Sequence, residues 1–137
     1  MLLVLLAGCS DLREFQGTWR GARVGESPAL RVGVATSATA ELSIEGIDAH
    51  GLRGHLAIDG LVDDAELVSL AGAEADTLSG LTFSGSPLRV YLAFVKVADS
   101  QGEALAVVAL YNDRRIEVRL LRGGQVPVYA IFVLTGP

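Results

Sequence analysis

Apolar and polar residues alternate along most of the chain with a period of two, which is typical of β-strands with one buried and one wet face. A clear alternation covers residues 40–45, and residues 52–59 repeat it after a turn at Gly51. These two stretches predict a β-hairpin. The same pattern recurs at residues 30–34 and at residues 116–120.

Four further stretches predict strands, and two of them are apolar on both faces. Residues 15–24 alternate around Trp19, whereas residues 88–98 and 103–111 are apolar at nearly every position. A strand that is apolar on both faces is covered on both sides or lies inside an oligomer. The last strand is expected at residues 126–134, because Pro127 stands near its start, where a missing N–H is tolerated.

Turn residues separate these stretches at intervals of about 8 to 12 residues, and helical periodicity is almost absent. We therefore expect an all-β fold, an antiparallel meander of about eight strands. Closure into a small up-and-down barrel would remove exposed sheet edges. A β-sandwich is the alternative.

Residues 60–87 are the least regular part of the chain. Asp63-Asp64-Ala65-Glu66 is expected to be a solvated acidic turn, and residues 67–70 and 81–84 predict short strands. Long irregular segments in compact domains are often functional loops. The stretch is therefore either a binding lid or a plain surface excursion.

The first nine residues form an apolar run that ends in the only cysteine of the chain. Such a run, ending in small residues, is typical of a secretory signal. It is shorter than a transmembrane helix, which needs about 20 apolar residues. Leu6-Ala7-Gly8-Cys9 resembles the lipobox of bacterial lipoproteins. The resemblance implies that Cys9 carries a lipid and becomes the mature N-terminus. We expect a signal segment at residues 1–8, a lipidated tether at 9–14 and one β domain at 15–137.

The residues around this motif extend the expectation. No Lys or Arg precedes the apolar run, although signal peptides begin with basic residues, so we expect the precursor to start further upstream. Ser10 follows Cys9, which by resemblance to sorting in Gram-negative bacteria favours the outer membrane. The alternative is that the run is a buried first strand with an ordinary free cysteine.

Gly17-Thr18-Trp19 resembles the Gly-x-Trp signature on the first strand of lipocalins and avidin-like barrels. The resemblance implies a calycin-like barrel in which Trp19 plugs the floor and an arginine from a late strand packs across it. Arg119 and Arg122 are the candidates for that arginine. The alternative is a core tryptophan on an ordinary strand. Arg115 and Arg119 are also expected to form a solvated ladder with Glu117, or to contact lipid headgroups.

Composition and charge narrow the chemistry. The chain has 137 residues, a formal net charge of −5 and scattered basic residues, which argues against nucleic acid as a partner. A single cysteine excludes an internal disulfide. His50 and His55 fall on opposite faces of a strand, so no zinc site is expected. No group of nucleophile, base and acid is recognisable, and we expect no catalytic residues, no metal, no cofactor and no enzymatic activity.

Two functions follow from these observations. The first is a membrane-anchored binding module for a small apolar ligand or an envelope protein, attached through the lipid on Cys9. The second is a structural or assembly lipoprotein that contributes a protein–protein surface. A ligand-sized cavity beside Trp19 would favour the small ligand. An exposed edge strand or apolar patch at residues 88–111 would favour the protein surface.

Overall fold

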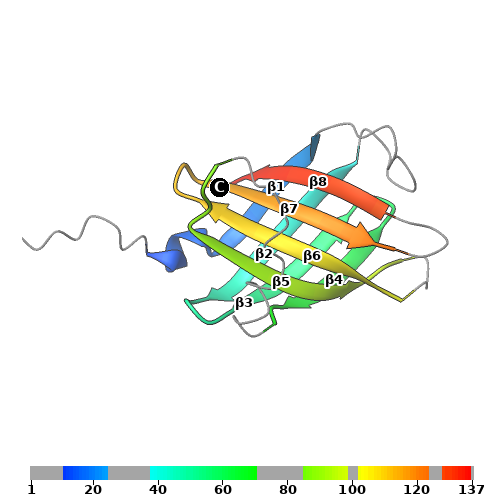
Figure 1. The fold of residues 1–137 in the computed structure, drawn as a ribbon, viewed down its shortest axis with the longest axis horizontal. Helices are drawn as coiled ribbons and strands as arrows, with labels where there is room; N and C mark the ends of the chain where they lie inside the picture. Colours follow the sequence, from blue (N-terminus) through cyan, green and yellow to red (C-terminus); the bar gives the residue numbers. More distant parts are fainter. Residues whose placement is uncertain (1–10, 25–37, 71–84, 99–101, 124–127, 137) are drawn as a thin grey trace, which may run out of the picture.

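A computed structural model describes residues 11–24, 38–70, 85–98, 102–123 and 128–136, and the structural statements below concern these residues. They form a short 3-10 helix, η1, followed by eight strands (Figure 1). The elements are η1 (Leu12–Phe15), β1 (Gly17–Val24), β2 (Thr39–Ile47), β3 (Leu52–Ile58), β4 (Val62–Val68), β5 (Arg89–Lys96), β6 (Glu103–Tyr111), β7 (Arg115–Arg122) and β8 (Val128–Thr135). Cys9 and the strands expected at residues 30–34 and 81–84 lie outside the described residues.

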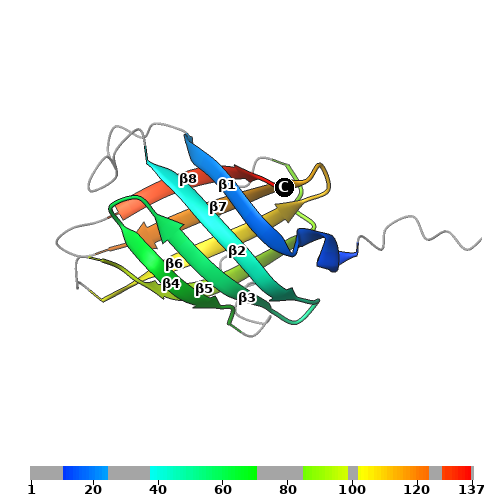
Figure 2. The same cartoon turned by 180° about the vertical axis from the view of Figure 1, so that it is seen from behind.

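The eight strands form one antiparallel sheet in the order β4-β3-β2-β1-β8-β7-β6-β5. Because β1 pairs with β8 as well as with β2, the meander curls back on itself. β5–β8 make one wall and β1–β4 make the other, with the strands of the two walls crossing (Figures 1 and 2). The expected all-β meander and the up-and-down barrel are confirmed, and the barrel is nearly closed.

The barrel stays open along one line, where β4 and β5 end the sheet. The Leu70 N–H donates to the Leu92 carbonyl and the Ala98 N–H donates to the Leu61 carbonyl, each at 2.7 Å. Between these two bonds, no ladder pair joins β4 to β5 among the described residues. We call this opening the seam.

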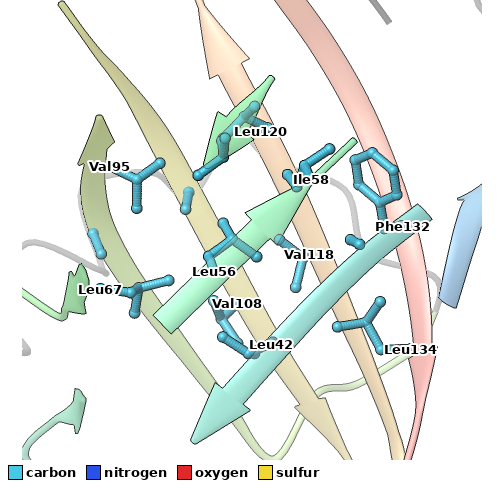
Figure 3. Packing of buried hydrophobic residues seen from close by; sticks show 14 of the residues in the cluster. Leu42, Leu56, Ile58, Leu67, Val95, Val108, Val118, Leu120, Phe132 and Leu134 are labelled. Atoms are coloured by element: carbon cyan, nitrogen blue, oxygen red, sulfur yellow. The ribbon is translucent and has the colours of Figure 1, made fainter. Parts of the chain in front are cut away.

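The inward residues of all eight strands form one continuous apolar cluster (Figure 3). Leu42 and Leu56 from one wall meet Phe132 and Leu134 from the other, and all four are fully buried. Alternate positions supply this cluster on β2 and β3, as the period-two pattern predicts. Burial of these side chains is the main stabilising contribution to the barrel.

Two glycines allow the strands to approach closely. A Cβ on Gly21 would lie 1.7 Å from the Val133 carbonyl oxygen of β8, and one on Gly54 would lie 1.9 Å from the Ser43 carbonyl oxygen of β2. The Gly21 contact lies between β1 and β8, the pairing that closes the barrel. Only a residue without a side chain permits this spacing.

The expectation of an acidic turn at residues 63–66 is wrong, because these residues belong to β4. Val62 and Leu67 are both buried although they stand five positions apart, a spacing that a regular strand places on opposite faces. A register shift between β3 and β4 and a positive φ of 41° at Asp64 reconcile the two positions. The irregularity interrupts the alternation by which a strand is recognised.

The start of the first strand also differs from the expectation. Phe15 lies in η1 and not on β1. The Asp11 carboxylate caps η1 by accepting a hydrogen bond of 3.0 Å from the Arg13 N–H. β1 then begins at Gly17, whose φ of 121° requires glycine.

Candidate functional site

Trp19 lies near the start of β1, at one end of the barrel. Its side chain is 1% exposed, and the indole Nε1–H donates a hydrogen bond of 2.9 Å to the Phe15 carbonyl. The Phe15 ring stacks on the indole, with 5.6 Å between ring centroids and 24° between planes. The Gly136 backbone lies against the other part of the indole, since a Cβ there would come within 2.7 Å of it. Trp19 is therefore held by η1, β1 and the end of the described chain together.

The hollow beside Trp19 is far too small for an organic ligand. It has a volume of about 30 Å³ and lies among Phe15, Glu14, Leu88, Asn112 and Arg114. A space of this size accommodates about one water molecule. Trp19 is thus a tightly packed residue of the core cluster, and Arg114 lines the small hollow beside it.

Arg119 and Arg122 do not lie at this floor. They pair in register with Ile131 and Val128 of β8, toward the opposite end of that strand from Gly136. The expectation that one of them packs across Trp19 is therefore wrong. The Gly17-Thr18-Trp19 motif on β1 does not determine which part of a late strand lies near Trp19, because that depends on the register of the sheet.

The expected solvated ladder on β7 is wrong as well. Arg119 and Glu117 are only 6% and 3% exposed, and the Arg119 Nε lies 2.6 Å from the Glu117 Oε1. Val118 between them belongs to the core cluster, so the pair faces outward. Arg115 instead lies over the Tyr111 ring, with its guanidinium carbon 4.1 Å from the ring centroid.

The outer side of β5 and β6 is apolar as well as the inner side. Leu92, Val107, Ala109 and Tyr111 are buried but are not part of the core cluster. This confirms that residues 88–98 and 103–111 are largely apolar on both faces, as the sequence predicts. Phe94, on the same side of β5 as Leu92, remains 52% exposed.

A groove of about 460 Å³ runs along the seam. Acidic residues of β4 form one side, Phe94 and Lys96 of β5 form the other, and Glu103 of β6 lies beside Lys96 in register. The full lining is Asp63, Asp64, Ala65, Glu66, Phe94, Lys96, Val97, Ala98 and Glu103. The groove could not be predicted from the sequence, because its acidic residues resemble a solvated turn and lie far along the chain from the strand that faces them.

His55 connects β3 to this acidic side. Its Nε2 lies 3.2 Å from the Glu45 Oε1, and its Nδ1 lies 3.8 Å from the Asp64 Oδ1. His50 lies apart, in the turn between β2 and β3. Within the described ranges, no three His, Cys, Asp or Glu side chains come together as ligands for a metal ion.

A second groove, of about 430 Å³, lies at the turn between β2 and β3. The Asp48 carboxylate accepts backbone hydrogen bonds from His50 and Gly51, which lower its pKa below the ordinary value. The Tyr91 hydroxyl donates to the Asp48 carbonyl at 2.7 Å, and burial raises the pKa of Tyr91. The Asp48 carboxylate therefore stabilises the turn, and the Tyr91 hydroxyl joins the turn to β5, so these polar groups have a structural role.

Comparison of the chain with protein-family models, with curated proteins and with solved structures finds no match. The part of the chain that the structure describes contains no helix that is long and apolar enough to span a membrane. The function is therefore inferred from the geometry of the barrel and from the motifs of the sequence.

Proposed function

We propose that this chain is a lipid-anchored lipoprotein of the outer membrane of a Gram-negative bacterium, and that its barrel is a non-catalytic module that binds an envelope protein. The hollow beside Trp19 favours a protein partner over a small ligand, because its volume is only about 30 Å³. Sites for small ligands measure about 300–1,000 Å³ and enclose most of the ligand. Two spaces of that size along the described residues are open grooves on the outside of the barrel.

The position of η1 supports attachment at the Trp19 end. η1 lies at that end of the barrel, directly before β1 (Figure 2). Cys9 precedes Asp11, the cap of η1, by two residues, and two extended residues span at most about 7 Å. A lipid on Cys9 would therefore hold the Trp19 end near the membrane and leave the opposite end and the walls available to a partner.

The second candidate is an assembly lipoprotein that contributes a permanent protein–protein surface. The observation that favours it is Phe94 on β5, which stays 52% exposed, whereas outward apolar residues beside it, such as Leu92 and Val107, are already covered within the chain. Exposed large apolar residues next to a polar rim are typical of interaction surfaces. The two candidates differ in the lifetime of the complex and not in the side of the barrel used.

Cross-linking in the native host tests the proposal. The chain is expressed with a photo-reactive residue replacing Phe94, or replacing Val24 as a control that is 41% exposed on β1. We expect one defined envelope protein to be linked at position 94, in the outer-membrane fraction only. A Cys9→Ser chain should lose both the membrane location and the cross-link.

Two outcomes would contradict the proposal. One is an outer-membrane location that survives Cys9→Ser, which would exclude the lipid as the anchor. The other is saturable binding of a fluorescent fatty acid that quenches Trp19, which would restore the small-ligand function. Survival of the cross-linked complex through a chase period would favour the assembly function over reversible binding.

A further inference from the structure

We propose that a row of outward apolar side chains across β4–β8 binds an amphipathic α-helix of the partner protein, with lysine or arginine along one flank of that helix. We call these side chains the outer row: Val68, Phe94, Leu105, Leu121 and Tyr129. The inference deepens the proposed function and rests on it for the source of the helix, an envelope protein.

The outer row crosses four neighbouring strands of one wall in register. Phe94 of β5 pairs with Leu105 of β6, and Leu105 pairs in turn with Leu121 of β7. Leu121 then pairs with Tyr129 of β8. The four side chains therefore form a line at right angles to the strands.

Val68 extends this line across the seam to β4. The hydrogen bond from the Leu70 N–H to the Leu92 carbonyl sets the local register of β4 against β5. Because the two strands run antiparallel, the residues two positions from this bond, Val68 and Phe94, stand opposite each other. The outer row thus spans five strands.

The outer row faces away from the core and is accessible. Each of its members stands next to a residue of the core cluster along its own strand, so the alternation of a strand points it outward. Val68 and Phe94 are 53% and 52% exposed, and the other three are partly exposed. Leu92 and Val107, the outward apolar residues two positions away on β5 and β6, are buried instead. Accessible apolar surface of this extent is typical of an interaction site.

The outside of the opposite wall has a different character. The outward positions of β2 are Glu41, Ser43 and Glu45, and those of β3 include Arg53 and His55. Polar side chains of this kind suit a face that meets only water. The apolar row, on the wall that faces the viewer in Figure 1, is a clear departure from the outside of β2 and β3.

Pairing within the sheet determines which kind of segment can bind. β6, β7 and β8 are each paired on both sides, and β4 and β5 are bonded to each other at both ends of the seam, so the row offers no open edge to a strand. A bound segment must therefore satisfy its own backbone hydrogen bonds, as an α-helix does. Neighbouring strands lie about 4.8 Å apart and one helical turn rises about 5.4 Å. Each side chain of the row therefore meets about one turn of a helix laid along it.

Charges beside the row determine the polarity of that helix. The next outward residues of β4, β5 and β6 are Glu66, Lys96 and Glu103, and all three are exposed. Two carboxylates and one ammonium group leave this flank negative, which favours lysine or arginine on the facing flank of the helix. Exposed ion pairs contribute little affinity, so the apolar contacts supply most of the binding and the charges orient the helix.

The same flank argues against two other occupants of the row. An anionic lipid surface attracts basic segments and repels a negative flank. A second copy of the chain carries a net charge of −5 and the same negative flank. Cross-linking distinguishes both from a helix of another protein.

Site-specific cross-linking of the full-length chain in its native host maps the partner along the row. A photo-reactive residue replaces Leu105, Leu121 or Tyr129 in turn, and it replaces Ser43 or Ala57, equally partly exposed on the opposite wall, as controls. We expect the three row positions to link one partner at residues that advance by three or four along its sequence from strand to strand, the spacing of one helical turn. The control positions should give at least tenfold less linked product.

Charge reversal supplies the second arm of the test. Glu66→Lys combined with Glu103→Lys should reduce the product linked at Leu121 at least fivefold. The control combines Glu14→Lys with Asp113→Lys, two exposed acids away from the row, and makes the same change in net charge. It should alter the yield less than twofold, and circular dichroism of the purified chains should show that both double variants remain folded.

The inference is overturned if the linked positions advance by two, if they scatter over separate segments, or if the row links only lipid, a second copy or nothing. Equal yields at row and control positions, or equal effects of the two double variants, would overturn it as well. The proposed function survives these results if a partner is still linked at Phe94 and Cys9→Ser still removes the chain from the outer membrane. Conversely, a helix linked along the row of a chain without a lipid on Cys9 would support this site and contradict the lipoprotein.

Discussion

Replacement of Trp19 by Phe tests whether the indole is the plug that completes the barrel floor. The indole N–H donates to the Phe15 carbonyl, and the ring is buried between Phe15 and Gly136. Phe leaves that buried carbonyl without its donor, at a cost of about 1–3 kcal/mol. The smaller ring also leaves part of the space empty, at a further cost of about 1–2 kcal/mol. We expect the free energy of unfolding to fall by about 2–5 kcal/mol.

The assay is urea unfolding followed by circular dichroism, because the substitution removes the only tryptophan. The transition midpoint should fall while the slope against urea stays unchanged. Phe94→Leu is the control, since it alters an aromatic residue that is 52% exposed, and it should change stability by less than about 0.5 kcal/mol. Equal effects of the two substitutions would refute the assignment of Trp19 as the plug.

Three further predictions concern the walls of the barrel. Gly21→Ala places a Cβ against the backbone of β8 and should cost about 3 kcal/mol in thermal or urea unfolding, whereas Gly123→Ala, with open space around it, should be nearly neutral. The Asp59 carboxylate accepts two hydrogen bonds from Thr39, which lower its pKa, so the stability that it contributes is present at neutral pH and is lost as pH falls through the lowered value. Asp59→Asn should therefore shift the urea midpoint at pH 7 and have little effect near pH 2. Tyr91→Phe removes one hydrogen bond to the turn after β2 and should cost about 1 kcal/mol in the same assay.

Alternation in the sequence predicted the strands in which polar residues occupy the outer face and the register is regular. β2, β3 and β7 follow the period-two pattern with their inward residues in the core cluster. β4 was not predicted over its full length because its regular alternation is interrupted. Asp64 has a positive φ and the register with β3 shifts, so the buried residues Val62 and Leu67 stand at an odd spacing. Local pattern analysis cannot detect a bulge that only the neighbouring strand imposes.

The candidate site was predicted less well, since it depends on which strands meet. Trp19 was correctly singled out as a residue of the core, but its neighbour Arg114 is set by the β6–β7 turn and not by any motif. The Glu117–Arg119 pair looked solvent-facing because alternation shows the face of a strand but not what covers it. The seam required knowing that β4 and β5 end the sheet, a property of the whole topology.

Mass spectrometry of the N-terminal peptide, taken from chain purified out of outer membranes, tests the proposed function most directly. The proposal predicts a chain that begins at Cys9 with a diacylglyceryl group on its sulfur, and a Cys9→Ser chain that is absent from the same membranes. An unmodified Cys9 within a chain that still begins at Met1 or upstream, in a protein that stays in the cytoplasm, would contradict the proposal.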